Sequence, residues 1–163
     1  MKNIVLIGMP SCGKSTVGKI IAEKTGREFI DTDFLVEEAC GVSIPEIFKE
    51  NGEIYFREKE REAVVLAASS DGAVIACGGG VVLDERNINA LKENGIIAFI
   101  KRDVRKLSTE GRPLSKDIET LEKMQKIRMP LYEKYAEIIV KNDKEPIDAA
   151  EEIMRGTDEN NGN

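Results

Sequence analysis

Eight residues near the N-terminus have the types and spacing of a phosphate-binding loop. The run GMPSCGKS, residues 8–15, matches the pattern G-x-x-x-x-G-K-S/T at every fixed position. Glycines let a backbone wrap around a phosphate with its N–H groups pointing inward, and a following helix N-terminus adds a favourable partial charge. In this pattern Lys14 bridges the β- and γ-phosphates and Ser15 binds Mg²⁺. The predicted nucleotide-binding residues are Gly8, Pro10, Ser11, Cys12, Gly13, Lys14, Ser15 and Thr16.

Two interpretations other than phosphate binding are possible for this loop. The first is a chance glycine-rich turn, but an apolar run precedes the loop and a helical pattern over residues 16–24 follows it, which is the context that a phosphate loop needs. The second is that Cys12 is a redox sensor, which would require an exposed thiol with a lowered pKa. ATP or GTP binding is the prediction that we carry forward.

The elements that must position the loop alternate between strands and helices. Apolar runs typical of strands occupy residues 4–7, 28–30, 73–76, 96–100 and 138–140, and charged segments with helical spacing lie between them, as at 53–69 and 119–135. Continuous apolar strands separated by helices indicate a parallel sheet that is covered on both faces. The predicted fold class is α/β: a three-layer α/β/α domain with a five-stranded parallel sheet and the P-loop NTPase fold.

The residues that follow the strands narrow the class of nucleotide-binding protein. The guanine-reading N-K-x-D and the D-x-x-G of GTPase switches are both missing, and residues 73–76 lead into CGGG rather than into the acidic residue of a motor ATPase. Asp31 and Asp33 instead follow the second strand. Because the carboxyl ends of parallel strands face one crevice, these carboxylates, Ser15 and the glycines are expected to converge. This layout is typical of a small-molecule kinase.

Composition bounds the partners and the compartment. The 163 residues carry a net charge of −6 with a pI near 5.0 and show no basic run, which argues against nucleic-acid binding. The three cysteines lack metal-binding spacing and there is no histidine, so a zinc site is not expected. The first apolar stretch is too short for a signal peptide or a membrane span. A cytoplasmic protein without a membrane partner is the simplest interpretation.

Domain boundaries follow from the same pattern. Residues 1–155 are predicted to form a single kinase domain, in which 32–61 is the substrate-binding segment and 107–118 is a lid flap. Residues 156–163 are polar and are predicted to be a disordered tail.

Six motifs in register resemble the shikimate kinases. They are the loop GMPSCGKST, the segment FIDTD, residues 56–60 (FREKE), the CGGG after the third strand, RPL at 112–114 and RMPLY at 128–132. The resemblance covers about residues 4–153. It implies transfer of the γ-phosphate of ATP, with Mg²⁺, to the 3-hydroxyl of shikimate, which gives ADP and shikimate 3-phosphate in aromatic amino-acid biosynthesis, by a chain that acts as a monomer.

The resemblance also implies roles for individual residues. Asp33 is the carboxylate that binds the substrate hydroxyls and accepts a proton, although it would also suit the N-cap of a helix that begins at Phe34. Asp31 supports Mg²⁺ through water, and a turn carboxylate is its alternative. Arg57 and Arg128 clamp the shikimate carboxylate with their planar forks. The close-approach glycines of the substrate site are Gly78, Gly79 and Gly80.

The resemblance extends to the lid, with two departures from the family's usual residues. Arg112 corresponds to the lid arginine that stabilises the transferring phosphate, and either Lys106 or Arg105 stacks on adenine. Ser11 replaces a frequent glycine, and Ser115 stands where an apolar residue is common. The alternatives left open are a kinase for gluconate or a nucleoside monophosphate, and a nucleotide-binding protein that has lost its chemistry.

Overall fold

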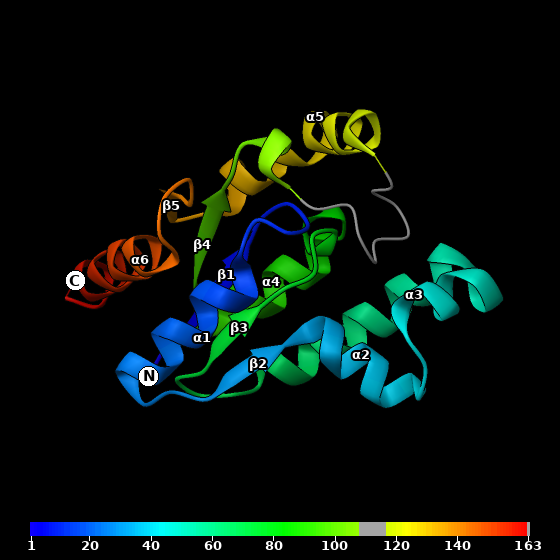
Figure 1. Cartoon of the computed structure of the whole chain (residues 1–163). Coiled ribbons are helices and arrows are strands. Elements are labelled where there is room, and N and C mark those ends of the chain that lie inside the picture. Colours follow the sequence, from blue (N-terminus) through cyan, green and yellow to red (C-terminus); the bar gives the residue numbers. More distant parts are fainter. Residues whose placement is uncertain (108–116, 163) are drawn as a thin grey trace.

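A computed structural model describes residues 1–107 and 117–162. Its centre is a parallel sheet of five strands in the order β2-β3-β1-β4-β5 (Figure 1). The strands are β1 (Asn3–Ile7), β2 (Phe29–Asp31), β3 (Val74–Ala76), β4 (Gly95–Lys101) and β5 (Ile138–Lys141). The predicted five-stranded parallel sheet is confirmed, and all five strands lie where the apolar runs placed them.

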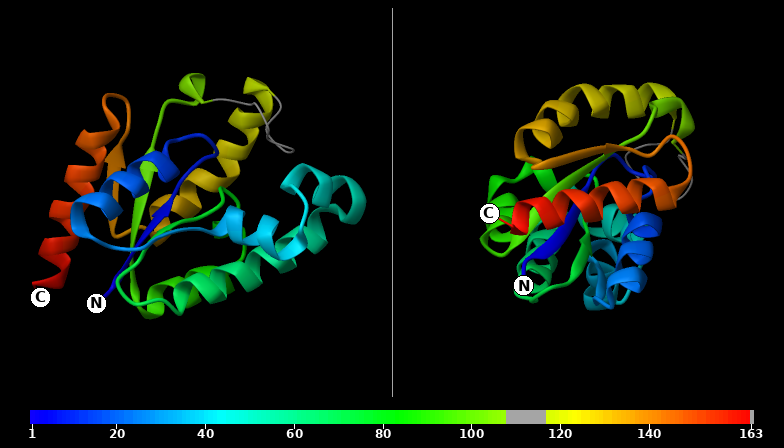
Figure 2. Two further views of the ribbon diagram at one scale, coloured as in Figure 1. Left: turned by 60° about the horizontal axis from the view of Figure 1, so that its bottom comes forward. Right: turned by 90° about the vertical axis from the view of Figure 1, so that its left-hand side faces the viewer.

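Helices cover both faces of this sheet, as the predicted α/β/α layering requires. They are α1 (Lys14–Thr25), α2 (Thr32–Cys40), α3 (Ile44–Ala68), α4 (Glu85–Glu93), α5 (Ile118–Tyr135) and α6 (Pro146–Asn161), with short 3-10 turns η1 (Val81–Leu83) and η2 (Val104–Lys106). α1 packs beside α6, and α3 packs beside α4 (Figure 2). All residues of β1 are buried, because the central strand of a covered parallel sheet meets side chains on both faces.

A second, smaller apolar cluster lies away from the sheet. Val36, Ile47, Phe56 and Ala63 form it, between α2 and α3. This pair of helices projects from one end of the sheet in Figure 1 and in the left-hand view of Figure 2. Gly52, with φ 83°, interrupts the helical geometry of α3 and kinks it. Residues 32–61, the predicted substrate-binding segment, therefore form an arm that has its own packing.

The C-terminal segment differs from its prediction. α6 continues through Asn161 instead of giving way to a disordered tail at residue 156. Gly156 faces the Ile138 side chain so closely that an added Cβ would lie 2.9 Å from the Ile138 Cδ1, and Thr157 is buried. Polar composition hid this contact, because a small residue on one helical face was enough to dock the last turns on β5. None of the helices in the described part of the chain is both long and apolar enough to cross a membrane.

Candidate active site

The loop between β1 and α1 is shaped by glycines at positions where other residues cannot fit. Gly8 has φ 152°, and a Cβ added to it would lie 2.6 Å from the Ile100 carbonyl oxygen. Gly13 has φ 101°, and its Cβ would meet the Asn142 amide. Ser11 has φ 63°, a left-handed conformation that glycine adopts more readily. The loop thus has the tight wrap that the sequence pattern predicts.

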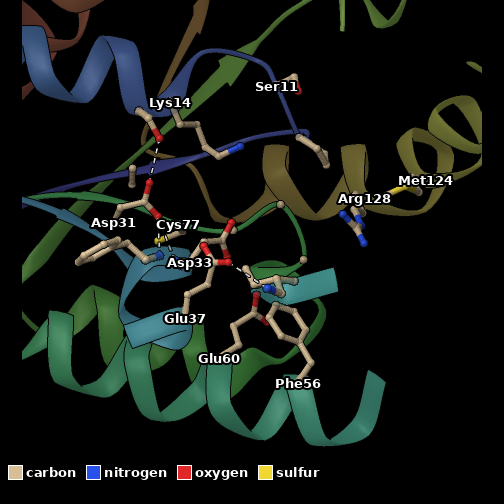
Figure 3. A pocket seen from close by; sticks show the side chains of 18 of the residues that line it. Ser11, Lys14, Asp31, Asp33, Glu37, Phe56, Glu60, Cys77, Met124 and Arg128 are labelled. Atoms are coloured by element: carbon tan, nitrogen blue, oxygen red, sulfur yellow. Dashed lines mark hydrogen bonds between the residues drawn. The ribbon is translucent and has the colours of Figure 1, made fainter. Parts of the chain in front are cut away.

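Side chains hold this loop from both sides. The Lys14 ammonium donates hydrogen bonds to the carbonyl oxygens of Gly8 at 2.8 Å and Met9 at 2.9 Å, and it lies above the cavity in Figure 3. From the end of β5, the Asn142 Nδ2 donates to the Cys12 carbonyl oxygen at 2.9 Å. The loop geometry is therefore set before any phosphate arrives, which lowers the cost of binding one.

Asp31 connects the loop to the second strand. The Ser15 hydroxyl donates to Asp31 Oδ2 at 3.0 Å, while Asp31 Oδ1 accepts the backbone N–H of Asp33 at 2.9 Å and of Phe34 at 3.3 Å. Asp31, and not Asp33, is therefore the N-cap of α2, so the alternative that Asp33 serves as a helix cap is wrong. The helix begins one residue before Asp33, which places Asp33 in its first turn, where its carboxylate faces the cavity.

Two carboxylates meet at the first glycine after β3. A Cβ on Gly78 would lie 2.6 Å from Asp33 Oδ1 and 3.0 Å from Glu60 Oε2, and Figure 3 shows both carboxylates pointing toward the same part of the cavity. Glu60 is only 1% exposed, and burial raises the pKa of its carboxyl above the ordinary value. Only glycine leaves room between these acids, as predicted for a close-approach position.

Two guanidinium groups flank the other two glycines. A Cβ on Gly79 would lie 3.2 Å from Arg128 Nη1, and a Cβ on Gly80 would lie 2.6 Å from Arg57 Cζ. Arg128 is buried; burial lowers the pKa of its guanidinium, and the Arg57 charge lowers that pKa further. Two cations held this close favour an anion between them. The predicted pair from α3 and α5 is thus brought together.

Glu60 positions Arg57, and Tyr132 holds Gly79, the glycine that faces Arg128. Sequence reasoning gave neither residue a role. Glu60 Oε1 accepts from Arg57 Nη1 at 2.9 Å. The Tyr132 hydroxyl donates to the Gly79 carbonyl oxygen at 2.6 Å and its ring stacks on Phe99. An acidic residue three positions after Arg57 and a tyrosine one turn after Arg128 were the available signals, because such spacings share a helix face.

A single cavity of about 600 Å³ joins the loop to these acceptor-side residues. The predicted residues that line it are Pro10, Ser11, Gly13, Lys14, Ser15, Thr16, Asp31, Asp33, Arg57, Gly78, Gly79, Gly80 and Arg128. Gly8 and Cys12 are buried in the loop itself. The other residues that line the cavity are Phe34, Glu37, Ile44, Pro45, Phe48, Phe56, Glu60, Ala76, Cys77, Arg102 and Met124. Burial raises the pKa of the Cys77 thiol, which keeps it protonated. Arg112 and Ser115 lie outside the described residues.

Comparisons with known proteins agree on one family. The family model described as shikimate kinase matches residues 10–157. A shikimate kinase of Thermodesulfovibrio yellowstonii is 40% identical over 163 residues, covering 95% of this chain and 94% of that protein. A shikimate kinase of Clostridium botulinum is 42% identical over 161 residues, covering 95% and 97%. The solved structure of shikimate kinase from Acinetobacter baumannii in complex with shikimate has a TM-score of 0.92 at 33% identity and covers 98% of this chain and 94% of its own. The chain belongs to the shikimate kinase family.

Proposed function

We propose that this protein transfers the γ-phosphate of ATP to the 3-hydroxyl of shikimate, giving ADP and shikimate 3-phosphate. The observation that carries the proposal is the joined cavity, which has the phosphate loop at one end and Asp33, Arg57 and Arg128 at the other. A cavity of this kind holds a hydroxyl in line with a phosphate. Phosphoryl transfer needs positioning and charge stabilisation more than covalent help from the protein.

The acceptor end supports a hydroxylated carboxylate as substrate. Arg57 and Arg128 supply two cations beside the glycine backbone, and a carboxylate can form paired hydrogen bonds with a guanidinium. Asp33 faces the same space from α2, where it binds a ring hydroxyl and accepts its proton as the new P–O bond forms. Gluconate also carries a carboxylate and hydroxyls. A nucleoside monophosphate, by contrast, has no carboxylate for the two arginines to bind.

The residues at the loop fit Mg²⁺. The Ser15 hydroxyl and the Asp31 carboxylate are hydrogen-bonded to one another beside the loop, and Mg²⁺ in kinases takes few protein ligands because it keeps waters and phosphate oxygens in its shell. Within residues 1–107 and 117–162, no group of three or more Cys, Asp or Glu is arranged to hold a metal, which is compatible with such a site. Mg²⁺ there would neutralise phosphate charge, with Ser15 as a direct ligand and Asp31 as a water-mediated one.

The remaining assignments rest on sequence alone. Arg112 is proposed to stabilise the transferring phosphate from the 107–118 segment, and the enzyme is proposed to act as a cytoplasmic monomer. Sedimentation at assay concentrations would test the monomer, and Arg112→Ala should lower kcat by about a hundredfold if the guanidinium meets the transition state.

A coupled assay that measures ADP release tests the proposed reaction. Shikimate, gluconate and AMP are offered side by side at equal concentration, and ADP release is expected with shikimate alone. Asp33→Asn keeps the shape of the side chain and removes its charge, so kcat should fall by about a hundredfold or more with little change in melting temperature. Turnover of gluconate or AMP in preference to shikimate would refute the acceptor, and an Asp33→Asn enzyme of normal kcat would refute the role of Asp33.

A further inference from the structure

Arg102 occupies a distinctive place at the end of β4. The strand ends at Lys101, one residue earlier, and β4 pairs with β1, the strand that leads into the phosphate loop. Gly8 of that loop closely approaches the Ile100 carbonyl. Arg102 is therefore the first residue beyond the sheet on the strand beside the loop. Its side chain lines the same cavity as Ser11, Gly13 and Lys14.

Within residues 1–107 and 117–162, no side-chain partner of the Arg102 guanidinium explains this position. In the described part of the chain, Arg102 makes no hydrogen bond or ion pair through its side chain, and its Nε is buried without an acceptor. Arg57, by contrast, is paired with both Glu53 and Glu60. A buried donor without a partner is costly. In a protein with a net charge of −6, carboxylates were available to pair with it, yet none of the described ones does.

A second hollow, of about 700 Å³, borders the cavity at this residue. It lies between η2, α5 and the end of β5, and Arg102 lines both spaces, whereas Lys126 of α5 lines only the second. Arg102 thus stands where the phosphate-loop cavity opens sideways. A ligand that lies on the loop and extends out of the cavity on this side must pass its side chain.

We propose that Arg102 binds the phosphate chain of the nucleotide, as a second cationic group beside Lys14. This rests on the proposed function, because a bound nucleoside triphosphate is the anion in question. The planar guanidinium matches phosphate oxygens with two parallel N–H donors. Lys14 already donates to two loop carbonyls, so a single ammonium would have to neutralise much of the charge of the phosphate chain without Arg102.

Nucleotide binding in the absence of shikimate tests this role. Dissociation constants for ADP and for adenosine are measured by competition with a fluorescent ADP, using wild type, Arg102→Gln, Arg102→Lys and the control Lys126→Gln, which removes an exposed cation that lines only the second hollow. Arg102→Gln is expected to weaken ADP binding by about ten- to a hundredfold, the range for a hydrogen bond to a charged group, and to change adenosine binding less than about twofold. The ADP affinity of Arg102→Lys should lie between those of wild type and Arg102→Gln. Lys126→Gln should stay within about twofold of wild type for both ligands.

Several results would overturn the role. ADP affinity unchanged in Arg102→Gln would exclude a phosphate contact, and an equal loss for adenosine would move the contact to the base or to general folding. An equal loss in Lys126→Gln would show that any positive charge near the cavity has the same effect, and that Arg102 makes no specific phosphate contact. If Arg102→Gln does not fold, Arg102→Lys carries the test, since it keeps the charge and the aliphatic stem but lacks the fork; unchanged ADP affinity would then refute the proposal. The titrations are made without shikimate, so they do not depend on the acceptor. A wild type that binds ADP but does not phosphorylate shikimate would therefore refute the proposed function and leave the role of Arg102 standing.

Discussion

The two ends of the cavity are built by different means. At the nucleotide end the main chain forms the site: glycine conformations, loop carbonyls held by Lys14, and one carbonyl held by Asn142. At the acceptor end, side chains from α2, α3 and α5 form it around the glycine triplet, and part of that end rests on the small cluster of α2 and α3 rather than on the sheet.

This difference has consequences for binding. A site made of backbone on the central strand of a buried sheet changes shape only at the expense of the core. A site made of side chains on an arm can reorganise more easily, since its cluster is small and Gly52 breaks the helix beneath it. Nucleotide affinity should therefore be insensitive to changes at the acceptor end, whereas acceptor affinity should depend on single side chains.

The largest expected effect comes from Lys14→Met at the nucleotide end. The ammonium is the one charged side chain bonded to the loop carbonyls in the described residues, and its loss removes charge that stabilises the transferring phosphate. We expect kcat to fall by about a hundred- to a thousandfold, measured as ADP release under saturating ligands. Shikimate affinity should stay within about twofold, since the acceptor residues are untouched. Turnover above about a tenth of wild type would contradict the assigned role.

Arg57→Ala tests the acceptor end in the same way. Its guanidinium faces Gly80 beside Arg128, and truncation leaves a bound carboxylate short of one cation. Shikimate affinity should fall by about ten- to a hundredfold, while ADP affinity measured alone should hold. A shikimate analogue with a neutral hydroxymethyl in place of the carboxylate should bind wild type poorly and lose little more in the variant. If titrations of both ligands show no coupling, the carboxylate lies elsewhere.

The sequence predicted correctly those features that are encoded by residues adjacent in the chain. The phosphate loop, the strands and the glycine triplet are contiguous runs, so their geometry followed from their own residues. Glu60 escaped, because its importance comes from burial under Gly78, and a glutamate on a charged helix has no local mark of burial. The helical turns around Gly156 escaped for the same reason: docking on Ile138 is a contact between distant residues. Asp31 took the capping role considered for Asp33, since a shift of the helix start by two residues exchanges neighbouring acids.

Glu60→Gln separates burial from ion pairing at the acceptor end. Burial outweighs the Arg57 charge and raises the folded-state pKa of Glu60 above the ordinary 4.5. The folded state therefore keeps this proton to a higher pH than the unfolded chain does. The contribution of Glu60 to stability falls as pH rises from about 4.5 through the folded-state pKa, and then levels off. The glutamine variant lacks this dependence. Urea unfolding of both proteins between about pH 4 and 8 should show that the free energy of unfolding of wild type decreases relative to that of the variant as pH rises.

If wild type instead gained stability relative to Glu60→Gln as pH rises, the ion pair with Arg57 would outweigh the burial of Glu60. Glu60→Gln should also raise the KM for shikimate by less than about tenfold, since the glutamine side chain still offers an oxygen to Arg57. A KM for ATP that rises in parallel would show that the two ends are not independent.

The smallest expected effect concerns Ser11, which among the described residues is the one non-glycine residue with a positive φ. Its φ of 63° costs an L-residue about 1–2 kcal/mol, and glycine would release that strain while giving back about 0.4–1 kcal/mol through a more flexible unfolded chain. Ser11→Gly should therefore raise the free energy of unfolding by about 0.5–1 kcal/mol, which for a chain of this size is about 1–4 °C in melting temperature. ADP affinity should stay within about twofold, since the backbone path is unchanged. Ser11→Val, which places a β-branched residue at the same φ, should destabilise instead. A loss of stability in the glycine variant would mean that the Ser11 side chain stabilises the loop by more than its backbone strain costs.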